Sequence, residues 1–370
     1  MKRGWLVACA LACACRARSD PRADIDRALA RAGRFLAAQQ DRDGAFRSRP
    51  YSALRDGWSL TPLAALALRV TPEHDAAARA ARFVAGIVGA HGVRGADEVS
   101  YPLYAYALGA LVLGAPENVD AYRAPRDALL AAVRRMQLSA ANGWRADDAS
   151  LGGWGYSPVV PTRPAGAITE DLLPANLSAT VLAVGALALA GTPPTDPALA
   201  DAAKFVARCR NGDGGFFFSP DLPDGNKAGR DAHGFRSYGS MTADGTRALM
   251  RLRGPADPHV AAGIAWLERE FDATRNPGVF GDNEIRRASS YYYWVWSAAH
   301  ALEHAQRGTA WAEQLSAALL ARQRDDGSWR NDATEMREDD PVIATSFAVA
   351  ALALCRNALG GEQQRHAAWR

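Results

Sequence analysis

Two kinds of helical segment alternate along the chain. Six segments are apolar around most of their circumference and rich in Ala and Leu, at residues 59–70, 100–113, 176–190, 238–252, 290–304 and 342–355. The segments between them are amphipathic, with apolar positions on one side only. A helix that is apolar all round must be buried, whereas a one-sided helix can face water. The alternation therefore predicts an inner ring of helices enclosed by an outer ring.

Turns that contain Gly, most of them with an aromatic residue, follow the amphipathic segments. They occur at residues 44–46, 91–93, 142–144, 214–216, 278–280 and 327–329, with a period of about fifty residues where no insertion intervenes. Glycine suits such turns because it adopts the left-handed conformation in which many helices end. A repeat of this length predicts one continuous architecture rather than two separate domains. We predict an all-α fold, a single α/α toroid of six helix pairs over residues 24–357, with a C-terminal tail at 358–370.

The N-terminal residues have the pattern of an export signal. A basic start at residues 1–3 precedes a short apolar stretch at 4–14 and a charged segment. This pattern predicts a signal peptide over residues 1–15 and a linker over 16–23. Residues 10–13 read Ala-Leu-Ala-Cys, as in a lipoprotein signal, so Cys13 or Cys15 is the predicted lipidation site, with plain secretion as the alternative. We expect the protein in the cell envelope, attached to a membrane through a lipid anchor alone, or otherwise periplasmic or secreted.

Composition and charge exclude several classes of function. Of 370 residues, 43 are Lys or Arg and 40 are Asp or Glu, giving a net charge of +3, and 48% are hydrophobic. Because no basic stripe is concentrated anywhere, nucleic acid is not an expected partner, and the apolar fraction is that of a folded protein. Beyond the signal, Cys209 and Cys355 are too far apart in sequence to indicate a metal cluster or a disulfide scaffold. No metal or cofactor is expected, and the sequence points to no protein partner.

The best-formed turn carries a family resemblance. Its sequence is Arg31-Ala32-x-x-Phe35-Leu36-x-x-x-Gln40-x-x-x-Gly44-x-Phe46, and it resembles the repeat, called the QW motif, of squalene-hopene-type terpenoid cyclases and protein prenyltransferase β subunits. The pattern returns as Gln323-x-x-x-Gly327-x-Trp329, and more loosely as Gln137 with Gly143-Trp144 and as Lys204-Phe205 with Gly214-Gly215-Phe216. Val88 and Phe271 stand where repeats two and five would carry the Gln. The resemblance implies an α/α toroid that binds an apolar or isoprenoid-like small molecule in a central cavity, at the N-terminal ends of the inner helices.

Acidic and aromatic residues gather where the inner helices are predicted to begin. Unpaired N–H groups and the helix dipole stabilise anions at such ends. An Asp or Asn in this position is also a common helix cap, so each has a structural alternative. The candidates for the ligand cavity are Asp56, Trp58, Glu98, Tyr101, Asp171, Asn176, Arg236, Tyr238 and Tyr292.

The two reactions of the family lack their usual residues. Terpenoid cyclases protonate an alkene with an Asp-x-Asp-Asp motif, which this sequence does not contain. The pair Asp339 and Asp340, before the sixth inner helix, is the candidate catalytic acid. Prenyltransferases hold zinc with Asp, Cys and His where inner helices begin, and the matching positions here offer neither Cys nor a suitable His. Residues 300–304 spell His-x-x-Glu-His, a zinc-protease signature, but they fall at the opposite helix end.

The leading hypothesis is an exported toroid that binds its ligand without demonstrated catalysis. One alternative is an isoprenoid-cyclising enzyme in which Asp339 or Asp340 is a displaced acid and Arg236 or Tyr238 steers the substrate. Another is a polysaccharide-active α/α-barrel enzyme, which needs two opposed carboxylates across a cleft. Its candidates are Asp56, Glu98, Asp171 and Asp340. A third is a structural interaction module whose centre is filled by side chains.

Overall fold

The structure is a computed structural model that describes residues 20–166 and 170–360. The predicted signal peptide, with Cys13 and Cys15, lies outside the described residues, as do most of the predicted linker and tail. The first described helix begins at Pro21, inside the segment predicted as linker, because Asp20 caps it and Pro suits the first helical position. The last described helix continues to Leu359, inside the predicted tail.

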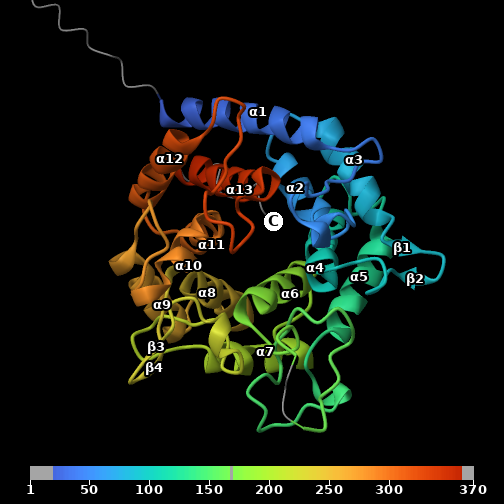
Figure 1. The fold of residues 1–370 in the computed structure, drawn as a ribbon, viewed down its shortest axis with the longest axis vertical. Helices are drawn as coiled ribbons and strands as arrows, with labels where there is room; N and C mark the ends of the chain where they lie inside the picture. Colours follow the sequence, from blue (N-terminus) through green and yellow to red (C-terminus); the bar gives the residue numbers. More distant parts are fainter. Residues whose placement is uncertain (1–19, 167–169, 361–370) are drawn as a thin grey trace, which may run out of the picture.

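The long helices form two concentric rings, seen along the ring axis in Figure 1. The inner helices are α2 (Thr61–Leu68), α4 (Pro102–Leu113), α6 (Leu177–Leu189), α8 (Gly239–Arg253), α11 (Tyr291–His304) and α13 (Pro341–Leu359). The outer helices are α1 (Pro21–Gln39), α3 (His74–Ala85), α5 (Arg123–Arg135), α7 (Pro197–Arg208), α9 (Pro258–Glu270) and α12 (Ala310–Arg322). Each inner helix contacts the next, and α13 contacts α2, so the ring is closed. The prediction of an all-α toroid of six helix pairs is confirmed.

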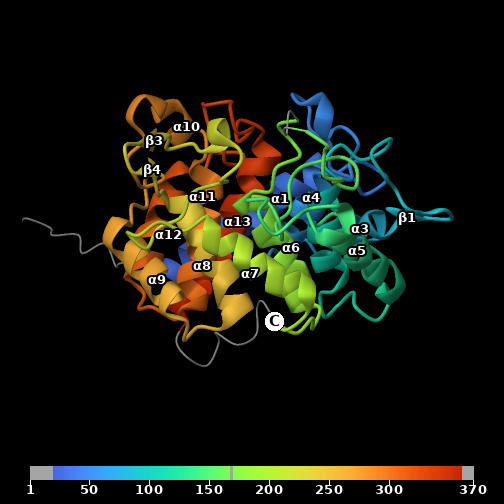
Figure 2. The same cartoon turned by 90° about the horizontal axis from the view of Figure 1, so that it is seen from below.

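Short elements occupy the connections between the long helices. They are the 3₁₀ turns η1 (Ser52–Leu54), η2 (Ala140–Asn142), η3 (Pro223–Gly225) and η4 (Gly281–Asn283), helix α10 (Glu284–Ala288), and strands β1 (Val88–Gly89), β2 (Gly92–Val93), β3 (Arg230–Asp231) and β4 (Gly234–Phe235). The strands form two antiparallel hairpins, in which Val88 lies opposite Val93 and Arg230 opposite Phe235. Figure 2 shows α10, β3 and β4 together at one end of the barrel. This is the end at which the inner helices begin.

Burial follows the predicted pattern with one departure. Inner helices α4 and α6 are buried along almost their whole length, whereas outer helices α3 and α7 bury one side. Helix α13 is long and apolar enough to cross a membrane, but most of it is buried against its neighbours, as in the core helix of a soluble protein. The departure is α8, which carries Asp244 and Arg247 in the barrel interior although its segment was predicted to be apolar.

Three turns join consecutive outer helices through a Gln side chain. Gln40, after α1, donates to the Gly44 carbonyl of its own turn and to the Ala76 carbonyl of α3, both at 3.0 Å. Gln323, after α12, donates within its own turn and to the Ala28 carbonyl of α1, both at 2.9 Å, and so closes the outer ring. The primary amide has two N–H donors, so one Gln satisfies two carbonyls at once.

The third repeat uses a different turn from the one predicted. Gln137 donates to the carbonyls of Gly152 and of Ala198 in α7, both at 2.8 Å, and not to the turn at 142–144. Gly152 has a φ of 88°, and a side chain there would overlap the Asp201 carbonyl of α7. Trp154 takes the buried aromatic position. The predicted turn at 142–144 belongs to an inserted loop that precedes this one.

Candidate functional site

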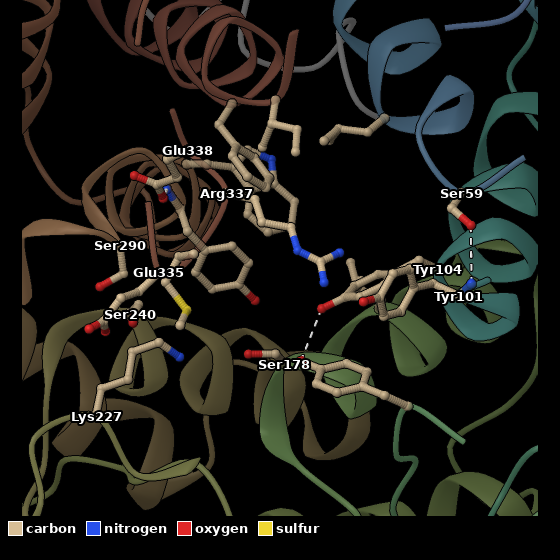
Figure 3. Close-up of a pocket in the computed structure, with 18 of the residues that line it drawn as sticks. Ser59, Tyr101, Tyr104, Ser178, Lys227, Ser240, Ser290, Glu335, Arg337 and Glu338 are labelled. Atoms are coloured by element: carbon tan, nitrogen blue, oxygen red, sulfur yellow. Dashed lines mark hydrogen bonds between the residues drawn. The ribbon is translucent and has the colours of Figure 1, made fainter. Parts of the chain in front are cut away.

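A central pocket opens at the end of the barrel where the inner helices begin. Its volume is about 630 Å³, within the range of sites for small organic molecules. Small hydroxyl side chains at the starts of four inner helices contribute to its wall, namely Ser59, Ser178, Ser240 and Ser290, all labelled in Figure 3. The pocket thus lies where the family resemblance places a ligand cavity.

The walls of the pocket are apolar and aromatic. Aliphatic side chains come from Leu54, Leu60, Leu63, Leu108, Leu182 and Ile343, and aromatic ones from Tyr101, Tyr104, Tyr156, Phe218, Tyr293, Trp296 and Phe347. The rings pack on one another: Tyr104 stacks on Tyr156 with 5.3 Å between centroids, and Phe347 lies 5.3 Å from Trp296. Such walls bind hydrocarbon by removing it from water, and they present electron-rich ring faces.

Two cations are directed into the pocket, Arg337 from the loop before α13 and Lys227 from the loop after η3 (Figure 3). The Arg337 guanidinium lies over the rings of Tyr51 and Tyr101, at 5.4 and 5.1 Å from their centroids. Lys227 lies over the ring of Phe218 at 5.1 Å. Within the described residues neither cation has a carboxylate partner in an ion pair. Burial lowers the pKa of Lys227 to about 8, because the pocket wall disfavours its charged form.

The loop that presents Arg337 is strained and anchored. Arg337 has a φ of 61°, in the left-handed region, which costs a non-glycine residue about 1 kcal/mol or more. The next residue, Glu338, is buried, and its carboxylate accepts the N–H groups of Tyr292 and Tyr293 at the start of α11, at 2.9 and 2.7 Å. Burial raises the pKa of Glu338 to about 7, although these N–H donors oppose the shift. Glu338 thus caps an inner helix, and both Glu338 and Arg337 line the pocket.

A second carboxylate is enclosed in the barrel, one turn along α8 from Ser240. Asp244 is 0% exposed and accepts hydrogen bonds from the hydroxyl of Tyr293, at 2.6 Å, and from Ser297 and Arg247. Burial raises the pKa of Asp244 to about 6, although Arg247 and the two hydroxyls oppose the shift. Because Tyr293 lines the pocket, this carboxylate is one hydroxyl group away from any occupant.

The predicted catalytic acids are engaged outside the pocket. Asp340 caps α13 by accepting the N–H of Val342 at 2.9 Å, and it also accepts the Ser48 hydroxyl. Asp339 accepts the hydroxyl of Tyr51. Neither lines the pocket. Helix capping therefore accounts for the position of Asp340.

Among the predicted cavity residues, Tyr101 alone lines the pocket. Two others serve the helix starts instead. Asn176 caps α6 by accepting a backbone N–H. Asp56 accepts the N–H groups of Ser59 and Ser100, at 2.9 and 2.8 Å, and so joins the starts of two neighbouring inner helices.

The remaining candidates do not line the pocket. Trp58 stacks on Phe83, Glu98 pairs with Arg94, Asp171 is exposed, Arg236 pairs with Asp231, Tyr238 packs on Phe280, and Tyr292 donates to the Arg330 carbonyl. One position along a helix turns a side chain by about 100°. For this reason Tyr293 lines the pocket and Tyr292 does not. Tyr104, one turn after Tyr101, was missed although its i+3 spacing was a usable signal.

Residue types that can bind a metal are spread through the described part of the chain. In residues 20–166 and 170–360, no group of three or more His, Cys, Asp and Glu is placed to hold a metal ion. His300, in the His-x-x-Glu-His segment, lies in the last part of α11, away from the pocket, with its ring edge-on to Trp296 at 5.3 Å. Cys209 and Cys355 are buried and are not joined by a disulfide.

Comparisons with known proteins give the same fold. The sequence matches the model of the prenyltransferase alpha-alpha toroid domain over residues 94–233 and 260–369. No curated protein matches the chain in sequence. A variant of the type II terpene cyclase MstE from Scytonema, in complex with its substrate geranylgeranyl dihydroxybenzoate, has 12% identity and a TM-score of 0.57, over 91% of this chain and 98% of that chain. A GH76 alpha-mannanase from Bacteroides thetaiotaomicron has 10% identity and a TM-score of 0.58, over 92% and 98%.

At such low identities the solved structures are similar in fold alone, and their activities differ from one another. The family model is different in kind, because it matches the sequence itself over most of the chain. The resemblance carried by the repeats is thereby confirmed. The chain belongs to the prenyltransferase alpha-alpha toroid domain family.

Proposed function

We propose that the protein binds an amphipathic, isoprenoid-like small molecule in its central pocket, with the hydrocarbon part along the aromatic walls and an anionic head at the rim. One observation carries this proposal: the apolar walls are combined with two cations, Arg337 and Lys227, that have no ion-pair partner among the described residues. A cation that faces an apolar pocket without a counter-ion is costly, and a ligand anion removes that cost.

A fold neighbour supports a ligand of this class. The MstE complex holds geranylgeranyl dihydroxybenzoate, an isoprenoid chain joined to a polar ring, in a toroid of similar fold. The pocket described above offers walls for such a chain and a rim for such a head. The identity of 12% makes this a likeness of fold, so the argument for the ligand rests on the lining residues.

The alternatives have less support. A cyclase that used Asp339 or Asp340 as its acid would need one of them at the pocket, and both are hydrogen-bonded outside it. A polysaccharide-active enzyme is compatible with the fold, since an alpha-mannanase is similar to it. However, none of its candidate carboxylates, Asp56, Glu98, Asp171 and Asp340, lines the pocket; the carboxylates that do are Asp224, Glu335 and Glu338. A filled interaction module does not account for a volume of about 630 Å³.

Binding is tested by isothermal titration calorimetry with farnesoic acid, an isoprenoid carboxylate. Arg337→Ala is expected to weaken binding about tenfold or more, the effect of losing one charge-assisted hydrogen bond of about 1.5 kcal/mol. Arg230→Ala is the matched control, because Arg230 also lies over a ring, that of Phe235 at 5.5 Å, but outside the pocket. If farnesoic acid, farnesol and squalene all fail to bind and to raise the melting temperature, the proposal is wrong. An equal loss of affinity in Arg337→Ala and Arg230→Ala would show that Arg337 has no specific role in binding.

The proposal includes export and a lipid anchor at Cys13 or Cys15. Its support is the sequence pattern of residues 1–15. In bacteria expressing the full chain, we expect radioactive palmitate to label the protein, and the double substitution Cys13→Ser with Cys15→Ser to abolish both the label and the membrane association. Unlabelled protein in the membrane fraction would refute the anchor.

A further inference from the structure

The inner end of the pocket carries hydroxyl groups that a hydrocarbon ligand would leave unused. The Tyr104 hydroxyl donates to the Tyr156 hydroxyl at 3.0 Å, and both rings line the pocket. Tyr293 and Ser178 line the pocket as well, each with its own hydroxyl group. Desolvated hydroxyls against an alkyl group forfeit hydrogen bonds, so the site is built for a ligand that has a polar atom there.

The direction of one of these hydrogen bonds is fixed by Asp244. The Tyr293 hydroxyl has a single proton, and that proton is donated to the Asp244 carboxylate at 2.6 Å. Asp244 keeps its orientation through Ser297 and Arg247, which also donate to it. The Tyr293 oxygen therefore has only its lone pairs left for the pocket. Next to a carboxylate these lone pairs are more electron-rich than those of a free phenol.

Resting on the function proposed above, we propose that the Asp244–Tyr293 pair forms a hydroxyl-binding subsite, so that the ligand is an oxygenated isoprenoid whose buried end carries an alcohol or phenol group. The ligand hydroxyl donates to the Tyr293 oxygen while its anionic head lies at Arg337. A ligand whose buried end is a carbonyl places its oxygen, an acceptor, against the Tyr293 oxygen, which is also an acceptor. Such a ligand binds less tightly. A plain hydrocarbon end leaves the Tyr293 oxygen without a donor.

A purely structural role for the pair explains less. Arg247 is 6% exposed and Asp244 is 0% exposed, and removing two charges from water costs about as much as their attraction returns. The Nε of Arg247 has no hydrogen-bond partner, and the guanidinium lies over Trp296 at 4.7 Å. A polar pair that contributes little to stability, placed behind a pocket-lining hydroxyl, is what a recognition site requires.

Charged groups around Asp244 keep it in the acceptor state at neutral pH. Arg247 faces it from α8, Lys227 lies on the loop above, and Tyr293 and Ser297 face it from α11. Burial raises the pKa of the carboxyl and these groups oppose the shift, so that its pKa is about 6. Above that pH Asp244 is a carboxylate, and Tyr293 donates to it.

The test compares two probes that differ by one oxygen atom, farnesoic acid and ω-hydroxyfarnesoic acid, by calorimetry at pH 7.5. The hydroxylated probe is expected to bind the wild type about 10-fold to 100-fold more tightly, as for one hydrogen bond to a carboxylate-polarised acceptor. Tyr293→Phe keeps the ring against Phe347 and removes the acceptor, so the preference should fall below about twofold. Tyr291→Phe is the matched control, because Tyr291 lies on the same helix but donates to the Ala273 carbonyl outside the pocket.

The outcomes separate this inference from the proposed function. If both probes bind the wild type equally, the isoprenoid pocket stands and the hydroxyl subsite is wrong. If neither probe binds, and farnesol and squalene fail as well, both proposals fail. If the preference persists in Tyr293→Phe, another group recognises the hydroxyl and the assignment is overturned. Asp244→Asn is a second, independent test, made on protein that circular dichroism shows to be folded. The Asn amide donates to the Tyr293 oxygen, so the Tyr293 hydroxyl proton turns to the pocket. A probe with an ω-oxo group should then bind more tightly than the hydroxylated probe.

Discussion

Substituting Glu338 by Gln should remove a large part of the pH dependence of stability. Glu338 is buried and its pKa is raised to about 7 from 4.5. Because the folded-state value is the higher one, the residue favours the folded state at low pH, and this contribution is lost as the pH rises through 7. The gap corresponds to about 3 kcal/mol in full, and most of it falls between pH 5 and pH 8.

The Gln variant also loses a hydrogen bond at every pH, since its amide nitrogen faces a backbone N–H of Tyr292 or Tyr293. That loss is a constant offset of about 1–3 kcal/mol. This offset cancels when the difference in unfolding free energy between wild type and variant at pH 8 is subtracted from the same difference at pH 5. The pH dependence that other carboxylates contribute to the unfolding free energy cancels in the same way, because both proteins share those residues.

The assay is urea unfolding followed by circular dichroism at several pH values, with the free energy extrapolated to water. The loss of unfolding free energy in Glu338→Gln should be about 2–3 kcal/mol larger at pH 5 than at pH 8. Glu335→Gln is the matched control, because it removes the same charge three positions earlier from a carboxylate that is 40% exposed. A penalty for Glu338→Gln that does not change with pH would refute the burial argument.

Three further predictions follow from the turns and the buried acids. Gly152→Ala should lower the free energy of unfolding by about 2–4 kcal/mol because a Cβ overlaps the Asp201 carbonyl, whereas Gly191→Ala, with the same φ of 88° but open space around it, should cost about 1 kcal/mol in the same urea assay. Asp340→Asn should keep the α13 cap and leave farnesoic acid binding unchanged, and Asp340→Ala should cost about 1–2 kcal/mol; loss of binding in the Asn variant would return this residue to the site. The preference for ω-hydroxyfarnesoic acid should shrink below pH 6. Asp244, with a pKa of about 6, then carries its own proton, so Tyr293 turns its hydroxyl proton to the pocket. Calorimetry across pH 5 to 8 measures the preference, and a preference that does not vary with pH contradicts the reasoning.

The ring architecture was predictable because it repeats. Apolar helices recur at a regular interval, and the turn around Gln40 is similar to the one around Gln323, so each repeat supports the assignment of the others. The third repeat shows where this fails. Gly143-Trp144 and Gly152-Gly153-Trp154 both have the required residue types, and only the contact of Gln137 with Gly152 distinguishes them.

The pocket was less predictable because its functional side chains follow no period. Arg337 and Lys227 come from loops whose paths depend on anchors such as Glu338, and a sequence pattern does not show those anchors. Near the helix starts, one position decides whether a side chain faces the pocket, and this separates Tyr292 from Tyr293. Asp244 lies in a segment that the alternation groups with the apolar inner helices, although it also carries Arg247 and Arg251.

The contact of Gln323 with Ala28 has a consequence for synthesis of the chain. These residues are 295 positions apart, so α1 leaves the ribosome long before its second neighbour in the outer ring. Until then the growing chain is an open arc, and the apolar sides of α1 and α2 that later meet α12 and α13 have nothing to cover them. Exposed apolar surface of this kind is what makes nascent chains aggregate. Completion of the barrel is therefore a late, long-range event, and the N-terminal helix pair needs protection, by a chaperone or by transient contacts, until the sixth repeat has been made.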